Sequence, residues 1–345
     1  MGKTPFVTSA VLVVAALLII CRVPARGTEL PSFEGSDGWI NTSPLSRADL
    51  SGKVVLVDFW EYTCVNCVRT FPTLRKWYRD YGPKGLVIVG IHTPEFTFGQ
   101  KRSNVQKAVT RFKLAYPVVL DNHMVLWDRF RNHYWPAEYL FDRNGRLVYH
   151  SIGEGDYDEM EKRIRSTLDL NGKPPGPSVE EEPYHPEMTR ELYAGSERGL
   201  LPAPAEVQSL GNETVSRFSG GDLRPDRFNP RGTWSVHREY LLPRPVQGHS
   251  PPVLLLPYNA SGVHLVLRPA GTKGAKIRVT LDGHPVPRSV AGPDIRYDRK
   301  GRSYLAVGAA RMYDLTAHQP FRFYTLGLEP VGNGPAFYSA TFDPG

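Results

Sequence analysis

Cysteine is scarce in this sequence: three of its 345 residues are Cys, at positions 21, 64 and 67. A structural zinc site normally needs four Cys or His ligands, and the sequence has no second Cys-x-x-Cys and no closely spaced His pair. Attachment of c-type haem needs a His directly after the second cysteine, where Val68 stands. These absences leave a structural disulfide or redox chemistry for Cys64 and Cys67, and we expect no metal.

The sequence also lacks long apolar runs after residue 26, so nothing beyond that point is expected to span a bilayer. No basic run is interleaved with aromatic residues. The 42 Lys and Arg are scattered among 35 Asp and Glu, which leaves a net charge of +7. We therefore expect no nucleic-acid binding and interpret the excess charge as solvated surface that favours anionic lipid headgroups.

The N-terminus has the pattern of a targeting segment. Lys3 precedes a mostly apolar run at residues 4–21, and Arg22 and Arg26 follow it. Residues 1–26 are predicted to be a signal peptide or an uncleaved N-terminal membrane anchor, and the sequence leaves both open. Ile20 fits a lipoprotein signal poorly, so Cys21 is expected to have no role. Either alternative predicts an exported, periplasmic or extracytoplasmic protein in a disulfide-competent compartment.

Residues 30–172 alternate between strand-like and helix-like patterns. Apolar runs at 53–60, 85–93 and 116–121 predict buried strands, and Asn144-Gly145 predicts a hairpin within 137–153. Helical spacing predicts helices over 67–82, 104–115 and 157–170, with a short one through residues 126 and 130. We expect an α/β domain with a mixed sheet and helices on both faces.

The second half of the chain has a different pattern. Residues 173–201 are rich in proline and predict an extended linker. From residue 202 to residue 345 short strand-like runs are separated by Gly, Pro and Asn turns, with no convincing helix. This spacing predicts an all-β sandwich domain of jelly-roll-like type.

The Cys64–Cys67 pair follows a predicted buried strand and opens a predicted helix. Free N–H groups and the macrodipole at a helix N-terminus favour a thiolate, which is the attacking species in disulfide exchange. Cys67, one turn inside, would then resolve the mixed disulfide. A purely structural disulfide here would close a loop too short to stabilise much. The pattern predicts Cys64 as nucleophile and Cys67 as resolving thiol.

The stretch "VLVDFWEYTCVNCVRTFP" resembles the thioredoxin fold. Asp58 stands six residues before Cys64, and Pro72 stands five after Cys67, as in that family. The resemblance implies that Asp58 accepts the proton of the resolving cysteine. A carboxyl in an apolar strand is pushed towards neutrality and can exchange a proton near physiological pH. The alternative for Asp58 is an acid that caps the end of the strand.

Thioredoxin folds also have a cis-proline that faces the active site. Pro136 in "HYWPAEYLFD" is the candidate, since the cis form is accessible only before proline. Pro117 is the alternative, but it comes too early in the fold order. The walls of the site are expected to be formed by Trp60, Tyr62 and Trp135, for which ordinary core packing is the alternative.

Further residues are expected near the site. Glu61 stands where similar sequences more often have an uncharged residue, and its carboxylate would oppose the thiolate or relay protons. Its alternative is an exposed rim position. His92, Thr93 and Glu95 in "HTPEF" follow the second long strand, so they are expected at the site rim or in loop hydrogen bonds. The remaining expected lining residues are Thr63, Val65 and Asn66, and the Val65-Asn66 spacer does not indicate the direction of electron flow.

A longer stretch, "FWEYTCVNCVRTFPTLRKWYRDYGPKGLVIVGIHTPEF", resembles the TlpA-like redoxins. Among these it resembles specifically the extracytoplasmic thioredoxin domain of DipZ-type cytochrome c biogenesis proteins. "GTWSVHREYL" and "IRVTLDGHPV" resemble the carbohydrate-binding-module-like sandwich attached to that domain. DipZ-type proteins carry a multi-span CcdA-like domain before these domains, where this sequence has one short apolar segment. A reductase would therefore need a separate CcdA- or DsbD-like membrane electron donor.

The resemblance implies a thiol-disulfide oxidoreductase that reduces or exchanges disulfides in exported proteins, with a lean towards cytochrome c maturation. No cofactor beyond the Cys64–Cys67 disulfide is expected. A thiol peroxidase is one alternative, although Cys64 lacks the preceding Pro-x-x-x-Thr-x-x pattern of peroxiredoxins. A module that binds cell-wall polysaccharide is the other. Its candidate sugar-stacking residues, for which core packing is the favoured explanation, are Trp234, Tyr258, Tyr297 and Tyr313.

Overall fold

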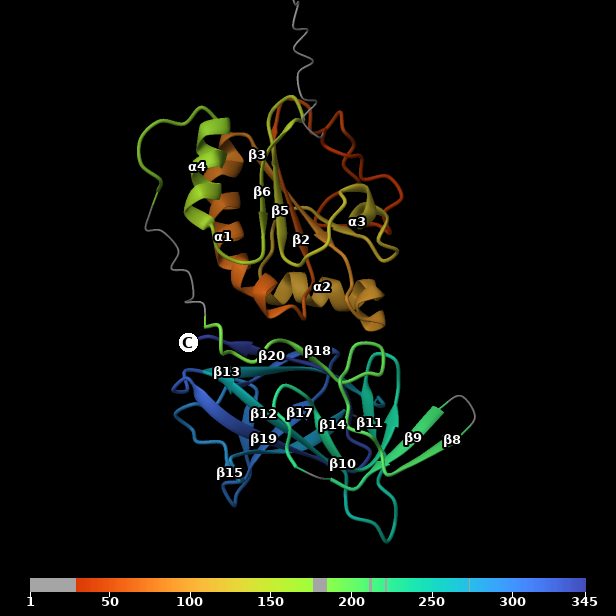
Figure 1. Ribbon diagram of the computed structural model, residues 1–345. Helices are drawn as coiled ribbons and strands as arrows, with labels where there is room; N and C mark the ends of the chain where they lie inside the picture. The colour runs from red at the N-terminus through yellow and green to blue at the C-terminus, as the bar shows by residue number, and fades with distance from the viewer. Residues whose placement is uncertain (1–28, 176–184, 211–212, 221, 273) are drawn as a thin grey trace, which may run out of the picture.

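The computed structural model describes residues 29–175, 185–210, 213–220, 222–272 and 274–345. The predicted leader at 1–26, with Cys21, lies outside the described residues, as does part of the predicted linker. Residues 29–175 form an α/β region and residues 185–345 form a β region, stacked one above the other (Figure 1). Among the described residues, no helix combines the length and apolar character needed to cross a bilayer.

The α/β region is built on a mixed six-stranded sheet, as predicted. Its strand order is β1-β4-β3-β2-β5-β6. Strands β2, β3 and β4 run parallel, while β1, β5 and β6 are antiparallel to their neighbours. All residues of the central strand β2 are buried, because helices or loops cover both of its faces. The strands are β1 (Trp39–Ile40), β2 (Val54–Trp60), β3 (Leu86–His92), β4 (Val118–Leu120), β5 (Ala137–Phe141) and β6 (Leu147–Ile152).

Helices cover both faces of this sheet. Alternate residues of β2 separate the two layers: Leu56 and Trp60 pack with the buried sides of α1, α2 and α4, whereas Val57 and Phe59 pack with α3. Figure 1 shows α1 and α4 side by side, with α3 on the far side of the sheet. The helices are α1 (Val65–Tyr81), α2 (Arg102–Arg111), α3 (Val125–Arg129) and α4 (Tyr157–Thr167), with 3₁₀ turns η1 (Gly82–Lys84) and η2 (Thr97–Gln100).

Local sequence signals explain the turns of this region. Gly82 caps the C-terminus of α1, as predicted, and Pro72 lies inside that helix. In the hairpin between β5 and β6, Gly145 has φ 75°, which glycine adopts without a steric penalty. The Asp142 carboxylate accepts hydrogen bonds from the N–H groups of Asn144 and Arg146 (2.8 and 2.9 Å), which closes the turn.

The β region contains antiparallel strands that pack around one core. One set of strands runs in the order β16-β17-β14-β19-β12-β10, and the other runs β10-β11-β20-β13-β18, so β10 belongs to both. Gly232, with φ 80°, lies where β10 passes from β12 to β9 and β11. The buried faces of both sets share one apolar cluster, as a sandwich requires. The jelly-roll topology stays a prediction.

The strands of the β region are β7 (Leu192–Tyr193), β8 (Glu206–Leu210), β9 (Glu213–Phe218), β10 (Asn229–Val236), β11 (Leu241–Pro243), β12 (Val253–Ala260), β13 (Gly262–Pro269), β14 (Ala275–Leu281), β15 (His284–Pro285), β16 (Ile295–Tyr297), β17 (Ser303–Val307), β18 (Arg311–Thr316), β19 (Arg322–Val331) and β20 (Pro335–Asp343). Strand β7 falls inside the predicted linker, yet it pairs with β20 and is part of this region.

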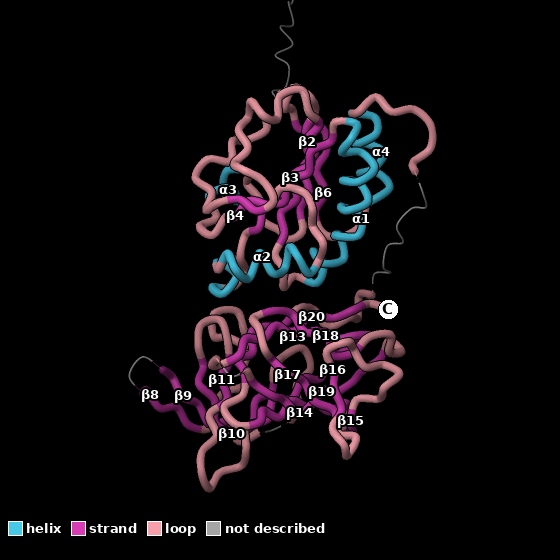
Figure 2. The backbone as a smooth tube through the Cα atoms, turned by 180° about the vertical axis from the view of Figure 1, so that it is seen from behind, coloured by secondary structure: helices cyan, strands magenta, loops and turns pink. Residues whose placement is uncertain are grey.

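The two regions are joined by a continuous apolar contact. Met312 and Tyr338 of the β region belong to the same buried cluster as the α1 side of the α/β sheet. The Tyr338 ring meets those of Phe96 and Phe98, with centroids 5.1 and 4.8 Å apart. Figures 1 and 2 both show α2 at the junction, next to the sandwich. The sandwich is therefore docked against the α/β region through buried side chains.

Candidate active site

The two cysteines lie at the start of α1, where the sequence predicts them. Cys64 is the N-cap residue, and its sulfur accepts a hydrogen bond from the N–H of Cys67 (3.2 Å). The two residues form a disulfide with their Cα atoms 5.3 Å apart. Cys64 is half-buried, whereas Cys67 is completely buried. No acidic residue stands in the first turn of α1. A thiolate at Cys64 would face the positive end of the helix.

Asp58 is completely buried in β2, on the sheet face that α1 covers. Neither of its carboxylate oxygens has a hydrogen-bond partner among the described residues. This burial raises the pKa of Asp58 to about 8. The carboxyl can therefore hold or release a proton near neutral pH.

Trp135 and Pro136 lie immediately before β5. Their peptide bond is cis, the isomer expected from the sequence. The Trp135 ring is half-buried and packs on that of Trp127, with centroids 4.3 Å apart. Trp135 also lines the same cavity as Cys64.

An aromatic cluster lies behind the cysteines. Trp60 is completely buried, edge-on to Phe71 (5.3 Å between centroids) and to His92 (4.9 Å), so it is a core residue as well as a neighbour of the site. Tyr62 stacks on His92 at 5.5 Å. His92 ends β3 at the expected end of the sheet, but it is fully buried rather than on an exposed rim, because these two rings enclose it.

Glu61 is also fully buried, which corrects the alternative of an exposed rim position. One of its oxygens accepts hydrogen bonds from the backbone N–H and the hydroxyl of Thr63. The other lies 3.6 Å from Nε2 of His92. These contacts hold the loop that leads from β2 to Cys64.

Thr93 and Glu95 point in different directions. The Thr93 hydroxyl donates to Asp121 (3.1 Å), so Thr93 makes the loop hydrogen bond that was its alternative role. Glu95 faces the β region, where it accepts hydrogen bonds from the Tyr193 hydroxyl (2.9 Å) and from Arg198 (2.8 Å). Burial raises the pKa of Glu95, and the positive charge of Arg198 acts in the opposite direction.

Both regions of the chain line the cavity at Cys64, which has a volume of about 210 Å³. The α/β region contributes Cys64, Val65, Asn66, Glu95 and Trp135. The β region contributes Met188, Thr189, Arg190, Glu191, Tyr193, Arg198, Thr341 and Phe342. The sequence pattern predicted the first set but not the second, because Thr341 and Phe342 lie more than 270 residues from Cys64 along the chain.

Comparison with known proteins identifies both regions. Residues 26–150 match the model of the AhpC/TSA family, and residues 189–343 match that of the thioredoxin like C-terminal domain. Protein DipZ of Mycobacterium tuberculosis is 33% identical over 303 residues, which are 85% of this chain and 42% of that protein. This chain is therefore similar to DipZ over most of its own length, and its α/β region has a thioredoxin fold. It spans less than half the length of the DipZ proteins that it matches.

Shorter relatives match the α/β region. Thiol-disulfide oxidoreductase YkuV of Bacillus subtilis is 28% identical over 140 residues, covering 40% of this chain and 93% of that protein. Among solved structures, a thioredoxin-like protein in the oxidized form is 26% identical and covers 43% of this chain and 99% of its own, with a TM-score of 0.39.

One buried acid of the α/β region was not predicted from the sequence. Glu138 lies directly opposite Asp58 in the β2–β5 ladder and is 2% exposed. Burial and the nearby negative charge of Asp58 raise the pKa of Glu138 well above its ordinary value. The signal was present, because an acid inside the apolar strand "AEYLF" is as unusual as Asp58 in "VLVDFW".

The candidate sugar-stacking aromatics are mostly part of the core. Trp234, Tyr258 and Tyr313 are completely or almost completely buried, and Tyr297 is half-buried. Three of the four therefore have no free face for a sugar ring, since inward-facing positions of a sandwich are filled by large apolar side chains. This finding corrects the glycan-stacking expectation at those positions.

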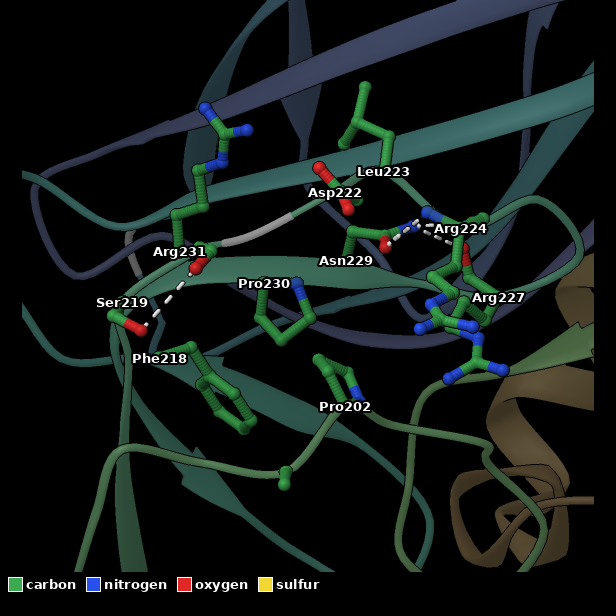
Figure 3. Close-up of a pocket in the computed structure, with 12 residues that line it drawn as sticks. Pro202, Phe218, Ser219, Asp222, Leu223, Arg224, Arg227, Asn229, Pro230 and Arg231 are labelled. Carbon is green, nitrogen blue, oxygen red and sulfur yellow. Dashed lines mark hydrogen bonds between the residues drawn. The ribbon is translucent and has the colours of Figure 1, made fainter.

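A larger cavity, of about 490 Å³, lies in the β region and away from the cysteines (Figure 3). Asn229 organises its wall by donating to the carbonyl groups of Arg224 and Arg227 (2.9 and 3.0 Å). Among the described lining residues the aromatic one is Phe218, which is buried. The wall therefore presents guanidinium groups and prolines rather than an aromatic platform. Within the described residues, no group of three or more His, Cys, Asp or Glu side chains is arranged to hold a metal ion.

Proposed function

We propose that this chain is an extracytoplasmic thiol-disulfide oxidoreductase that acts on disulfides of exported proteins through Cys64 and Cys67. The observation that carries the proposal is the asymmetry of the pair. A half-buried Cys64 at a helix N-terminus opens onto a cavity, and a buried Cys67 follows it on the face of the sheet that holds Asp58. The names of YkuV and other relatives support the same chemistry.

In the reducing direction, the Cys64 thiolate attacks one sulfur of a client disulfide. A Cys64–client bond forms, and the client bond breaks, releasing a client thiolate that takes a proton from water. Cys67 then loses its proton to the buried carboxyl, and its thiolate attacks Cys64. The Cys64–Cys67 disulfide forms, and the second client sulfur leaves as a thiolate. Two electrons pass from the pair to the client, and Asp58 is proposed as the acceptor of the Cys67 proton.

Reduction of the resulting disulfide needs an electron source, for which we propose a separate CcdA- or DsbD-like membrane protein. The apolar segment at residues 4–21 supports export, and the DipZ resemblance supports a role in cytochrome c maturation. The reduction potential of the Cys64–Cys67 pair tests the direction: a potential as low as that of thioredoxin supports a reductase, and one near that of DsbA supports an oxidant.

Cysteine variants test the proposed roles. Cys67→Ser should accumulate mixed disulfides with exported proteins, because Cys64 can attack but nothing resolves the bond. Cys64→Ser should accumulate none, and both variants should lose turnover of insulin disulfides to the uncatalysed level. Non-reducing gels and an insulin reduction assay measure both effects. Equal trapping by the two variants would contradict the assignment of roles, and consumption of hydrogen peroxide faster than insulin reduction would favour a thiol peroxidase.

A further inference from the structure

Asp58 and Glu138 are an opposed pair of acids in adjacent strands. In the antiparallel β2–β5 ladder they are directly opposite each other, a position in which Cβ atoms lie about 5 Å apart. Directly opposite residues project from the same face, which here is the one that α1 covers. Both are buried, Asp58 at 0% and Glu138 at 2% exposure. Two carboxyl groups therefore occupy one dry site under the helix that carries Cys67.

Among the described residues, no salt bridge joins either acid to a basic side chain. Both oxygens of Asp58 and Oε1 of Glu138 have no hydrogen-bond partner. On the other side of Asp58, β3 places Gly90, which has no side chain.

The remaining groups that act on the pair electrostatically are few. They are Tyr116, whose hydroxyl is buried without a partner, and Asp156, whose charge adds to the repulsion felt by Glu138. The α1 helix contributes Cys67 to the same buried cluster. It also carries Arg75, whose positive charge opposes the rise in the pKa of Tyr116 but whose guanidinium donates its hydrogen bond to the carbonyl of Phe112 (2.9 Å).

These surroundings prevent both acids from being ionised at once near neutral pH. Burial disfavours each negative charge, and the first charge opposes the second because little solvent lies between them. Interacting carboxyls of this kind lose their protons in two well-separated steps that belong to the pair rather than to either residue.

We propose that Asp58 and Glu138 titrate as one pair that holds at most one negative charge near neutral pH, and that the singly charged form of this pair, rather than Asp58 alone, accepts the proton of Cys67. The proposal deepens, and rests on, the thiol-disulfide exchange proposed above. When the Cys67 S–H bond breaks, its proton moves to the singly charged pair, which becomes neutral. The sulfur keeps the electron pair and attacks Cys64. The neutral pair returns one proton to solvent before the next cycle.

The first test counts the titration steps of the buried carboxyls. Full-length protein with ¹³C-labelled Asp and Glu carboxyls is titrated by NMR from pH 3 to pH 10, as wild type and as Asp58→Asn and Glu138→Gln. Wild type should show two buried transitions at least two pH units apart. Each single variant should lose the upper transition, because that step is the entry of the second charge. If either variant still shows a transition at the upper wild-type midpoint, its remaining acid titrates independently of the replaced one, and the proposal is overturned.

The second test measures the resolving step in single-turnover exchange with a small disulfide at pH 7. Either single variant retains one acid and should slow resolution by less than about 10-fold, whereas the Asp58→Asn/Glu138→Gln double variant should slow it by about 100-fold or more. If Asp58 acts alone, Glu138→Gln matches wild type and Asp58→Asn matches the double variant, which would overturn the proposal.

A matched control is Glu161→Gln. Glu161 is another buried acid next to α1, but it is paired with Lys76 (3.0 Å) and accepts from Tyr81 (2.5 Å). The Glu161→Gln substitution should leave both buried transitions and the rate of the resolving step unchanged. Circular dichroism verifies the fold of every variant. If wild type does not show two separate transitions, the acid-pair proposal is contradicted, but the proposed disulfide exchange is not. A protein that shows the two steps but exchanges no disulfide contradicts the proposed function instead.

Discussion

The α/β region and the β region differ in how their buried ionisable groups are paired. Under α1, Asp58 and Glu138 lie buried, and no cationic side chain in the described part of the chain pairs with them. In the sandwich, His264 is buried with a carboxylate on each ring nitrogen, Asp314 at 2.8 Å and Asp343 at 2.9 Å. Unpaired buried acids cost stability and have raised pKa values, so they can exchange protons near neutral pH, whereas a paired buried charge holds elements together. The difference distinguishes the site for which we propose proton exchange from a cluster that joins two parts of the fold.

The His264 cluster also reaches across the junction. Asp343 forms a salt bridge with Arg69 of α1, next to the cysteines. Burial by itself lowers the pKa of His264, but the hydrogen bonds with Asp314 and Asp343 outweigh it and raise the pKa to about 9. Burial alone would raise the pKa of Asp343, yet His264 and Arg69 lower it to about 2. His264 and Asp343 are therefore ionised at neutral pH, and the salt bridge of Asp343 with Arg69 ties the sandwich to α1.

The largest stability effect is expected at this cluster. His264→Asn should lower the free energy of unfolding by about 3 kcal/mol at pH 6, because two half-buried carboxylates lose the buried cation that they share. The folded-state pKa of His264 is raised, so its contribution is fully present below about pH 6.5 and is lost as the pH rises through about 9. Urea unfolding at pH 6 and pH 10 measures this. A loss that is the same at both pH values would contradict the ionic account.

The second prediction is a gain in the free energy of unfolding rather than a loss. Asp58→Asn should stabilise the oxidised protein at pH 9 by a few kcal/mol, because the folded state then buries no charge at this position. The pKa of Asp58 is raised by burial to about 8, so wild type loses stability relative to the variant between about pH 4 and pH 8. The gain should vanish near pH 3. Thermal unfolding across this range measures it, and a variant less stable than wild type at pH 9 would show that Asp58 is structural.

The smallest effect is expected at the rim of the junction. Arg198→Gln removes the guanidinium that donates to Glu95, but Arg198 is 39% exposed and the Tyr193 hydroxyl still donates to the same carboxylate. We expect a loss of about 1 kcal/mol in urea unfolding. Arg143→Gln, which breaks an exposed pair with Asp169, is the matched control and should cost less than about 0.5 kcal/mol. Equal losses would remove the distinction between the junction and the open surface.

Local patterns predicted much of the α/β region. The apolar run of β2, the helical spacing of α1, the Asn144-Gly145 turn and the choice of Pro136 all depend on a few neighbouring residues. The burial of Glu61 and His92 could not be predicted in this way, because it depends on rings and loops that meet only in the folded chain. For the same reason Trp234 and Tyr258 looked like candidate surface aromatics and proved to be core residues.

The sequence by itself determined the chemistry of this protein: a Cys-x-x-Cys pair at a helix N-terminus, an acid six residues before it and a proline able to adopt the cis form. These are properties of short segments, where spacing along the chain sets spacing in the fold. Only the tertiary structure decided which groups surround that chemistry. Strand pairing placed Glu138 opposite Asp58, and docking of the sandwich brought Phe342 and Arg198 to the cavity of Cys64. Contacts between residues so distant in sequence arise from the packing of whole elements, which no local pattern encodes.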